Sequence, residues 1–314
     1  MAQRPAHDGI IVMGAPRSGT TLLRRILDAH PDIACPGETN VLAGCARFLH
    51  SETIAEGVDI GVLAGLEFAG FAEDAVLEAL REFAFGFHRE YAKRQGKLRW
   101  ACKTAFDVFY WDDIEKLCGR HAYFVCLQRH GLDVACSLKE LCDANGIYLR
   151  ELHEYVRRYS RPLEAFCHAW ADVTLATRRF VERHPDNALL VKYEDLTADP
   201  EAVTRKIAEF VRVEWSPDWL AGVMQKPKHV GLGDWKTYAK DRIDTSSVGR
   251  WRALSEHTIG LMGRICNPVL EASGYPPVDV KAPRSTREAR RRYEVGLRIA
   301  GPAGRGAKPG RAGD

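Results

Sequence analysis

A loop of small, hydroxyl-bearing and basic residues near the start of the chain is suited to binding an anion. Residues 14–21, GAPRSGTT, follow the apolar run 10–13 and precede a stretch with helical spacing of apolar residues. In a strand–loop–helix unit of this kind, backbone N–H groups and the positive end of the helix dipole point to one place. The loop residues that we expect to bind a phosphate-like group are Arg17, Ser18, Gly19, Thr20 and Thr21.

The loop departs from the pattern G-x-x-x-x-G-K-[ST], which binds nucleoside triphosphates. Both glycines and Thr21 match this pattern, but Thr20 occupies the position of the lysine that contacts the β- and γ-phosphates. The nearest cation is Arg17, within the loop itself. We therefore expect an anion with fewer charges than a Mg-triphosphate, bound without a metal. The alternative is a glycine turn that only joins a strand to a helix.

Three further candidates stand at the ends of predicted strands. Lys103, Arg129 and Tyr193 each lie at or just after an apolar run that is typical of a buried strand. Ser137 follows Arg129 by eight residues. An arginine fork and a hydroxyl one or two helical turns later can bind the same phosphate. The alternatives are an arginine paired with a carboxylate and a tyrosine that only packs.

A fourth motif is DTSSVGRW at residues 244–251. Hydroxyl groups and a guanidinium so close together can donate hydrogen bonds to phosphate oxygens. The candidate ligands in this motif are Ser246, Ser247 and Arg250. We expect Trp251 to be a packing residue.

Together these motifs resemble the sulfotransferases that use 3′-phosphoadenosine-5′-phosphosulfate (PAPS). Residues 14–39, GAPRSGTTLLRRILDAHPDIACPGET, are especially similar to the tyrosylprotein sulfotransferase branch and to related bacterial sulfotransferases. The resemblance extends from about Ile10 to Tyr275. It implies that Arg129 and Ser137 bind the 3′-phosphate of the co-substrate and that Tyr193 lies near the nucleotide. It also implies that the motif with the two serines closes over PAPS, with 3′-phosphoadenosine-5′-phosphate (PAP) as the product.

The resemblance also implies which residues do the chemistry. In-line sulfuryl transfer needs a base for the acceptor proton and cations around the bridging and equatorial oxygens. Glu38 stands where the tyrosylprotein branch has its catalytic glutamate, and Lys103 matches a family lysine aimed at the leaving oxygen. The cytosolic branch has a histidine as base where this chain has Ala105, which favours Glu38; His229 is the second candidate. The alternatives are a solvated loop carboxylate and a surface ion pair.

Two departures from the tyrosylprotein branch concern the acceptor. That branch has arginines at the positions of Asn40 and Leu141. Loss of the first disfavours an acidic peptide, so we expect a small molecule with a hydroxyl group, such as a secondary metabolite, glycan or lipid. We also expect a bacterial, cytoplasmic enzyme. The alternatives are sulfation of a peptide tyrosine, a P-loop small-molecule kinase and a nucleotide-binding module without catalysis.

The elements that must position these residues alternate between strand and helix along the chain. Such alternation predicts an α/β fold with a doubly wound, mostly parallel sheet flanked by helices, and the resemblance implies the P-loop type. Ligands of such sheets bind at the carboxyl ends of the strands. The glycine loop, Lys103, Arg129 and Tyr193 would therefore meet at one edge of the sheet.

We expect one sulfotransferase domain over residues 1–280. A helical acceptor-binding lobe should comprise about 41–99 and 142–161, and within it the apolar spacing of 50–95 predicts mostly helix. Residues 281–314 carry Pro, Gly, Ala and Arg with few large apolar groups, which predicts a flexible basic tail.

Composition excludes several classes of protein. The 314 residues are 46% hydrophobic, enough for one large core. The nine cysteines show no CxxC or Cys/His spacing, so we expect reduced thiols and no metal site. We find no targeting segment and no apolar run of about 18 residues, so no transmembrane helix is expected.

The net charge of +3 is unevenly distributed. Residues 281–314 contain ten Lys/Arg and three Asp/Glu, a net of +7, so the rest of the chain has a net charge of −4. A nucleic-acid-binding domain usually gathers its basic residues on the folded part. We therefore expect no nucleic-acid partner.

Overall fold

The structure is a computed structural model, and it describes His7 and residues 9–56, 58–223 and 242–280. The chain divides into two units after Val278, and the following account concerns the first. The predictions for His229 and for the tail 281–314 lie outside the described residues. Within the described ranges, no helix combines the length and the apolar character needed to cross a membrane.

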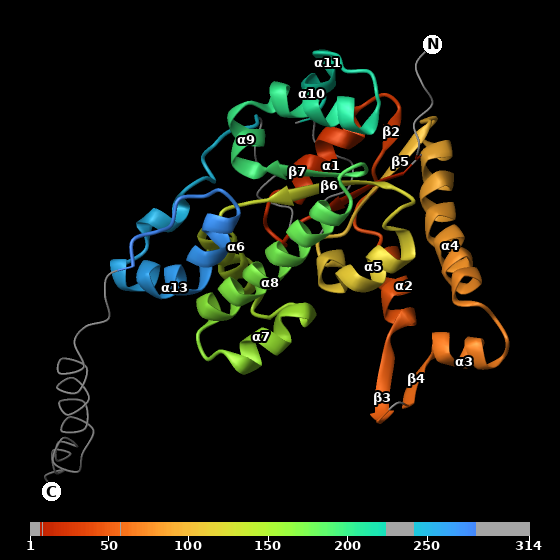
Figure 1. Ribbon diagram of the computed structural model, residues 1–314. Helices are drawn as coiled ribbons and strands as arrows, with labels where there is room; N and C mark the ends of the chain where they lie inside the picture. Colours follow the sequence, from red (N-terminus) through yellow and green to blue (C-terminus); the bar gives the residue numbers. More distant parts are fainter. Residues whose placement is uncertain (1–6, 8, 57, 224–241, 281–314) are drawn as a thin grey trace, which may run out of the picture. The chain divides into compact units, whose positions relative to one another are not determined.

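A parallel sheet of five strands forms the centre of the first unit, with the order β2-β5-β1-β6-β7 (Figure 1). The strands are β1 (Gly9–Met13), β2 (Ile33–Ala34), β5 (Arg99–Lys103), β6 (Tyr123–Gln128) and β7 (Ala188–Lys192). All four neighbouring pairs are parallel. The four strands predicted from apolar runs are confirmed, and only the two-residue β2 was not predicted.

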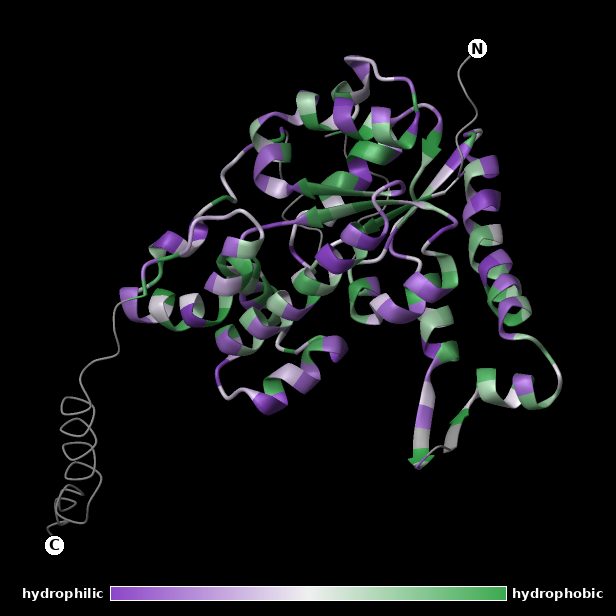
Figure 2. Cartoon of the chain, viewed as in Figure 1, coloured by the Kyte–Doolittle hydropathy of each residue, from purple (hydrophilic) through white to green (hydrophobic). Residues whose placement is uncertain are grey.

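Alternate residues of the central strand enter two different cores. Ile10 and Val12 pack on one face with residues of α1 (Thr20–Ala29), α9 (Tyr193–Ala198), α10 (Pro200–Val211) and α11 (Asp218–Ala221). Ile11 and Met13 pack on the other face. Because both faces are buried, the strand has no polar break. Figure 2 shows the resulting concentration of hydrophobic residues in the strands.

The second face of the sheet is covered by a larger set of helices (Figure 1). They are α2 (Val41–Leu49), α4 (Glu73–Arg94), α5 (Trp111–Cys118), α6 (Gly131–Asn145), α8 (Pro162–Arg183) and α13 (Glu256–Ala272). Shorter elements near them are α3 (Val62–Phe68), α7 (His153–Arg158) and the 3-10 turns η1 (Asp107–Tyr110), η2 (Arg150–Leu152) and η3 (Arg250–Ala253). Helices on both faces confirm the predicted doubly wound α/β fold.

One part of the predicted helical stretch 50–95 is wrong. Residues 51–61 form an antiparallel hairpin of β3 (Ser51–Ala55) and β4 (Val58–Gly61), in which Glu52 pairs with Ile60. Two residues, Glu56 and Gly57, separate the strands. The β-branched residues of this stretch, among them Ile54 and Ile60, favour strands. The rest of the stretch is helical, as α3 and α4.

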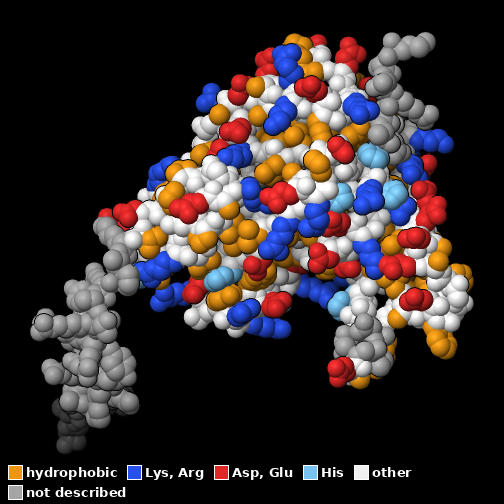
Figure 3. Space-filling view, in the orientation of Figure 1, with side chains coloured by type: hydrophobic (Ala, Val, Ile, Leu, Met, Phe, Trp, Pro, Cys, Tyr) orange, Lys and Arg blue, Asp and Glu red, His pale blue; other side chains and the backbone are white. Residues whose placement is uncertain are grey.

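The hairpin and α3 carry an exposed apolar surface. Ile54 and Ile60 are more than half exposed, and Phe68 at the end of α3 is 97% exposed. In Figure 3, apolar side chains are visible on this part of the molecule beside acidic ones, and apolar and charged side chains are interspersed over the rest of the face.

Candidate active site

The carboxyl ends of the parallel strands bring the predicted motifs to one edge of the sheet. Val12 is in register with Lys103, Met13 with Cys126, and Gln128 with Lys192. The segments that leave these strands line a cavity of about 400 Å³. The predicted site residues that line it are Arg17, Gly19, Thr20, Thr21, Glu38, Lys103, Arg129, Ser137, Tyr193, Ser247 and Arg250. Ser18 and Ser246 are not among its lining residues.

The glycine loop is shaped by Gly19, which precedes the first turn of α1. Its φ is 100°, in the left-handed region that favours glycine. A Cβ atom at this position would lie 2.3 Å from Cδ2 of Tyr193. Glycine is therefore required here for two reasons, and the ring of Tyr193 lies directly against the loop backbone.

The start of α1 offers N–H groups and no negative charge of its own. Its first turn contains no acidic residue, and no side chain caps it. The hydroxyl of Ser18 is buried and has no hydrogen-bond partner within the described residues. Arg17 has a φ of 72°, an unusual conformation for a residue with a side chain. An anion at this helix start would face several donors.

Arg17, Arg129 and Ser137 come together although they lie in different motifs. Nε of Arg17 donates to Oγ of Ser137 at 3.2 Å, and Nη1 of Arg129 donates to the carbonyl oxygen of Arg17 at 2.9 Å. The guanidinium of Arg129 lies over the ring of Tyr193, 4.5 Å from its centroid. The strand-end Arg129 thus holds the backbone of the glycine loop, and Arg17 joins that loop to the helix that carries Ser137.

The fourth motif meets the same arginine. Nη2 of Arg129 donates to the carbonyl oxygen of Ser247. The buried carboxylate of Asp133 accepts hydrogen bonds from the backbone N–H groups of Gly249 and Trp251, at 2.7 and 3.2 Å. Sequence reasoning did not single out Asp133. Asp133 could have been found from its position four residues after Arg129, in the first turn of α6, which faces the fourth motif.

The side chains of Ser246 and Arg250 in the fourth motif both have protein partners in this structure. The N–H and hydroxyl groups of Ser246 both donate to Oδ1 of Asp244, at 2.9 and 2.5 Å. The guanidinium of Arg250 forms an ion pair with Glu140 on α6, and both side chains are partly exposed. Of the predicted ligands in this motif, Ser247 and Arg250 line the cavity and Ser246 does not.

Glu38 and Lys103 form an ion pair on the cavity wall. Nζ of Lys103 lies 2.5 Å from Oε1 of Glu38. The lysine side chain is 1% exposed and the glutamate side chain 31% exposed. The ammonium is therefore buried, and its partner reaches solvent. A carboxylate that reaches the cavity can act as a proton acceptor, and a buried ammonium beside it can stabilise a developing negative charge.

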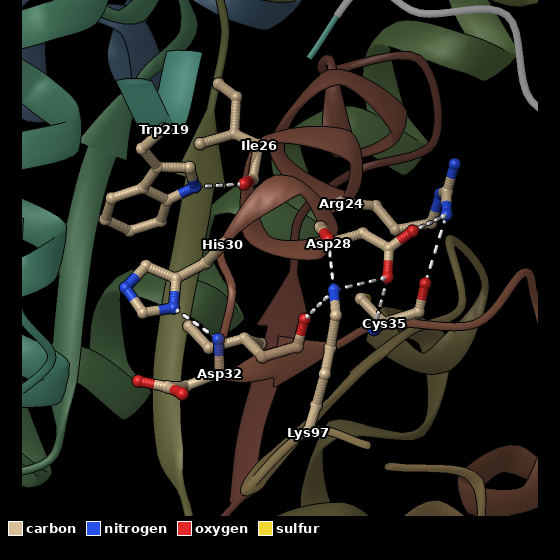
Figure 4. A network of polar contacts seen from close by, with 9 residues as sticks. Arg24, Ile26, Asp28, His30, Asp32, Cys35, Lys97 and Trp219 are labelled. Carbon is tan, nitrogen blue, oxygen red and sulfur yellow. Dashed lines mark hydrogen bonds and ion pairs between the residues drawn. The ribbon is translucent and has the colours of Figure 1, made fainter. Parts of the chain in front are cut away.

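A network at the far end of α1 anchors the segment that leads to Glu38 (Figure 4). Nζ of Lys97 donates to the carbonyl oxygens of Asp28 and Ile33, at 2.5 and 2.8 Å. Oδ1 of Asp28 accepts the N–H of Cys35 at 2.9 Å, and Arg24 donates to the carbonyl oxygen of Cys35 at 3.1 Å. These contacts fix the chain three residues before Glu38.

The cavity wall beyond this pair is mainly apolar. Phe106, Leu141, Ile147 and Leu149 line it together with the amide side chain of Asn145. Sequence reasoning named only Leu141 among them, but Asn145, Ile147 and Leu149 fall within the predicted acceptor-binding segment 142–161. Phe106 could have been found from its position three residues after Lys103, whereas 147 and 149 lie in a loop without a motif. In the described part of the chain, no group of three or more His, Cys, Asp or Glu is placed to hold a metal.

Comparison with known proteins agrees with this geometry. A family model described as the sulfotransferase family matches residues 9–217. A protein-tyrosine sulfotransferase of Drosophila melanogaster is 24% identical over 275 residues, which are 85% of this chain and 52% of that protein. The nodulation protein NoeE of Sinorhizobium fredii is 27% identical over 256 residues, which are 77% of this chain and 59% of that protein. The chain thus spans a little over half the length of these relatives.

Among solved structures, the sulfotransferase domain from the curacin biosynthetic pathway shares the fold. Its TM-score is 0.57 at 18% sequence identity, and the match covers 88% of this chain and 100% of that domain. At this sequence identity, the structural similarity shows the fold alone.

Proposed function

The chain belongs to the sulfotransferase family, and on that premise we propose that it transfers a sulfuryl group from PAPS to an acceptor hydroxyl. The products are PAP and a sulfate ester. The observation that carries the proposal is the contact of 2.5 Å between Lys103 and Glu38, on the wall of a cavity that also contains the glycine loop.

The glycine loop fits the 5′-phosphosulfate of PAPS. The start of α1 supplies N–H groups without an acidic neighbour, and the buried hydroxyl of Ser18 has no partner in the described ranges. Thr20 and Thr21 add hydroxyl donors on the cavity side. Thr20 in place of a lysine suits an anion with fewer charges than a triphosphate.

A second set of donors fits the 3′-phosphate. Arg17, Arg129 and Ser137 are linked by hydrogen bonds and all line the cavity. Two guanidinium groups and a hydroxyl on one anion make charge-assisted hydrogen bonds, which are about twice as strong as neutral ones. The ring of Tyr193, between Arg129 and the glycine loop, is placed to contact the nucleotide. Ser247 and Arg250 would then approach from the fourth motif.

Glu38 and Lys103 take different parts in the reaction. The bond between the acceptor oxygen and sulfur forms, and the bond between sulfur and the oxygen bridging to phosphate breaks. Glu38 accepts the proton of the acceptor hydroxyl as that oxygen loses electron density. Lys103 stabilises the negative charge that develops on the leaving oxygen. In an in-line displacement the attacking and leaving oxygens lie on opposite sides of sulfur, so we propose that the sulfuryl group binds with the acceptor oxygen toward Glu38 and the leaving oxygen toward Lys103.

For the acceptor, we propose an uncharged small molecule with a hydroxyl group. The apolar wall of Phe106, Leu141, Ile147 and Leu149 supports it. Sulfation of a peptide tyrosine is the second candidate, favoured by the similarity to the Drosophila protein-tyrosine sulfotransferase.

We further propose a bacterial enzyme of a reducing compartment, the cytoplasm. All nine cysteines are unpaired, and eight of them are buried. Unpaired thiols are typical of proteins kept in a reducing environment. The similarity to NoeE of Sinorhizobium fredii supports a bacterial source.

Transfer of radiolabelled sulfate tests the proposal. Wild type and Glu38→Gln would be incubated with labelled PAPS and two sets of acceptors, uncharged phenols or alcohols and an acidic tyrosine peptide. The exposed Glu52→Gln is the matched control. Label on the uncharged acceptors, lost in Glu38→Gln but kept in Glu52→Gln, is the expected result. Label on the peptide alone would favour the second candidate. No PAPS-dependent product from any acceptor and no PAP binding would overturn the proposal.

A further inference from the structure

The turn after Lys103 and the segment after Glu38 are joined at more than one point. The first contact is the ion pair of 2.5 Å between Lys103 and Glu38. In the second, the N–H of Asn40 donates to Oγ1 of Thr104 at 3.3 Å. Further along both segments, the carboxyl of Asp107 faces the N–H of Ala43 in the first turn of α2. The contacts therefore run in parallel along the two segments.

Asp107 carries the one charged or titratable side chain among these contacts that the proposed chemistry does not use. It is 0% exposed, and in the described ranges neither carboxyl oxygen has a hydrogen-bond partner of normal geometry. Its backbone N–H donates to the carbonyl oxygen of Thr104 at 3.2 Å, which closes the turn after Lys103. A wholly buried carboxyl group without a full partner is costly to the fold, so its retention calls for a role.

The start of α2 indicates what the role of Asp107 is. The helix begins after Asn40, whose φ of 56° is left-handed and whose side chain makes no cap hydrogen bond. No acidic residue stands in its first turn. The first intrahelical bond runs from the N–H of Gly44 to the carbonyl oxygen of Asn40, which leaves the N–H of Ala43 without a partner inside the helix. The carboxyl of Asp107 is therefore placed as a cap from another element.

We propose that Asp107 is a positioning residue, which docks the start of α2 on the turn after Lys103 and so fixes the contact between Lys103 and Glu38. The inference rests on the proposed function for the reaction that this pair serves. Asp107 itself touches neither substrate nor reacting atoms, since it is buried beneath the cavity wall.

The charge of Asp107 affects the ion pair between Lys103 and Glu38. Burial raises the pKa of Asp107 to about 8, with the carboxylate of Glu38 acting in the same direction. The titratable groups that face it are Glu38, Cys45 and Arg47 of the adjoining segment and α2, Cys102 and Lys103 of β5, and Cys118 of α5. Burial raises the pKa of all three thiols, so they stay neutral near pH 7.

Ionisation of Asp107 would therefore set two carboxylates in competition for one buried ammonium. Below pH 8 the carboxyl group of Asp107 is neutral and does not compete with Glu38 for the ammonium of Lys103. Above pH 8 the buried negative charge of Asp107 would attract Lys103 and weaken its contact with Glu38. The position of Asp107 beside the ion pair and its raised pKa together predict loss of turnover at alkaline pH, caused by a residue outside the cavity.

Two variants and a control test this inference. Asp107→Asn keeps a neutral polar group of the same size, Asp107→Leu removes it, and the exposed Asp112→Asn on α5 is the matched control. The turnover number and the acceptor KM would be measured from pH 6 to 10 with an alcohol acceptor, which does not ionise in this range. PAP affinity and the urea midpoint would be measured over the same range.

Wild type and Asp112→Asn should lose turnover about tenfold per pH unit above pH 8, as for loss of one proton. Asp107→Asn should keep turnover within about threefold at pH 7 and lack that alkaline decline. Asp107→Leu should lower turnover at least about tenfold with unchanged PAP affinity. A second readout is the urea midpoint, which should fall from pH 6.5 to 8 in wild type, above the range in which the buried histidines titrate, and stay level in Asp107→Asn.

An unchanged alkaline decline in Asp107→Asn, or full turnover in Asp107→Leu, would overturn the inference. If Asp107→Leu does not fold, Asp107→Asn alone decides. Failure of the proposed function looks different, because wild type itself would then neither bind PAP nor transfer sulfate.

Discussion

Nζ of Lys103 lies 2.5 Å from Oε1 of Glu38, and the lysine side chain is 1% exposed whereas that of glutamate is 31% exposed. An ammonium buried this completely requires a compensating charge. Glu38 supplies it from the cavity side, so the proton acceptor of the proposed reaction also balances the charge that stabilises the leaving oxygen. The two groups are therefore one unit, and changing either should change both structure and rate.

Glu38→Gln should abolish most of the turnover. The amide keeps an oxygen that can accept a hydrogen bond from Lys103, but it cannot take the acceptor proton. Loss of a general base lowers turnover by about 10²–10⁴-fold. Steady-state rates of labelled sulfate transfer would measure the effect. PAP affinity, measured by calorimetry, should stay within about threefold of wild type. Turnover close to wild type would assign the base to another residue.

Gly19→Ala should damage both stability and PAP binding. A Cβ atom there would lie 2.3 Å from the Tyr193 ring, and the φ of 100° is unfavourable for alanine. The backbone strain alone costs about 1–2 kcal/mol, and displacement of the ring should weaken PAP binding further. Urea unfolding and PAP titration would measure the two effects.

The matched control for this variant is Gly86→Ala in the middle of α4. A Cβ atom there would meet nothing within 4 Å. Alanine in a helix interior stabilises by about 1 kcal/mol relative to glycine. Equal effects of the two variants would contradict the account of the glycine loop.

Lys97→Met should loosen the segment that leads to Glu38. Lys97 donates to two carbonyl oxygens at 2.5 and 2.8 Å, and its side chain is only 20% exposed. Loss of hydrogen bonds from a charged donor should lower the free energy of unfolding by about 1.5–3 kcal/mol. Lys93→Met on the exposed side of α4 is the control, with an effect within about 0.5 kcal/mol. Comparable losses in both variants would argue against the network of Figure 4 as an anchor.

Stability should fall as pH decreases from about 6.5 to 4. Burial lowers the pKa of His88 and of His130 to about 4, below the ordinary value of 6.5. In that range the unfolded chain binds protons at these histidines and the native protein does not, so acid favours unfolding. Each should contribute at most about 3 kcal/mol.

Thermal unfolding as a function of pH checks this prediction. His88→Gln, which cannot titrate, should reduce the acid loss of stability. The exposed His257→Gln should retain the wild-type slope, because its side chain is open to solvent in both states. Identical slopes for all three proteins would show that the acid sensitivity arises elsewhere.

The sheet was predictable because burial on both faces leaves a clear pattern in the strands. Ile10 to Met13 form an unbroken apolar run, since alternate residues enter the two cores. The hairpin β3–β4 was not predictable in the same way. Its described side chains belong to neither core of the sheet, and its apolar spacing in the sequence merges with that of the helices that follow.

The location of the site followed from motifs placed at strand ends, but its internal pairing did not. Arg17 meets Ser137 across 120 residues, as two motifs at one sheet edge should. The ion pair of Arg250 with Glu140 depends on how a loop lies on α6, which no spacing in the sequence encodes. The role of Asp107 was not predictable from the sequence. An aspartate next to aromatic residues cannot be distinguished from a surface carboxylate until its burial is known.

The binding of PAP tests the central claim most directly. Wild type, Arg129→Ala and the exposed Arg120→Ala would be titrated calorimetrically with PAP, and with Mg-ATP as the competing ligand class. The account predicts micromolar or tighter PAP binding, no comparable ATP binding, and a loss of about 2–3 kcal/mol in Arg129→Ala but not in Arg120→Ala. Absence of PAP binding, or preference for ATP, would contradict it and favour a kinase.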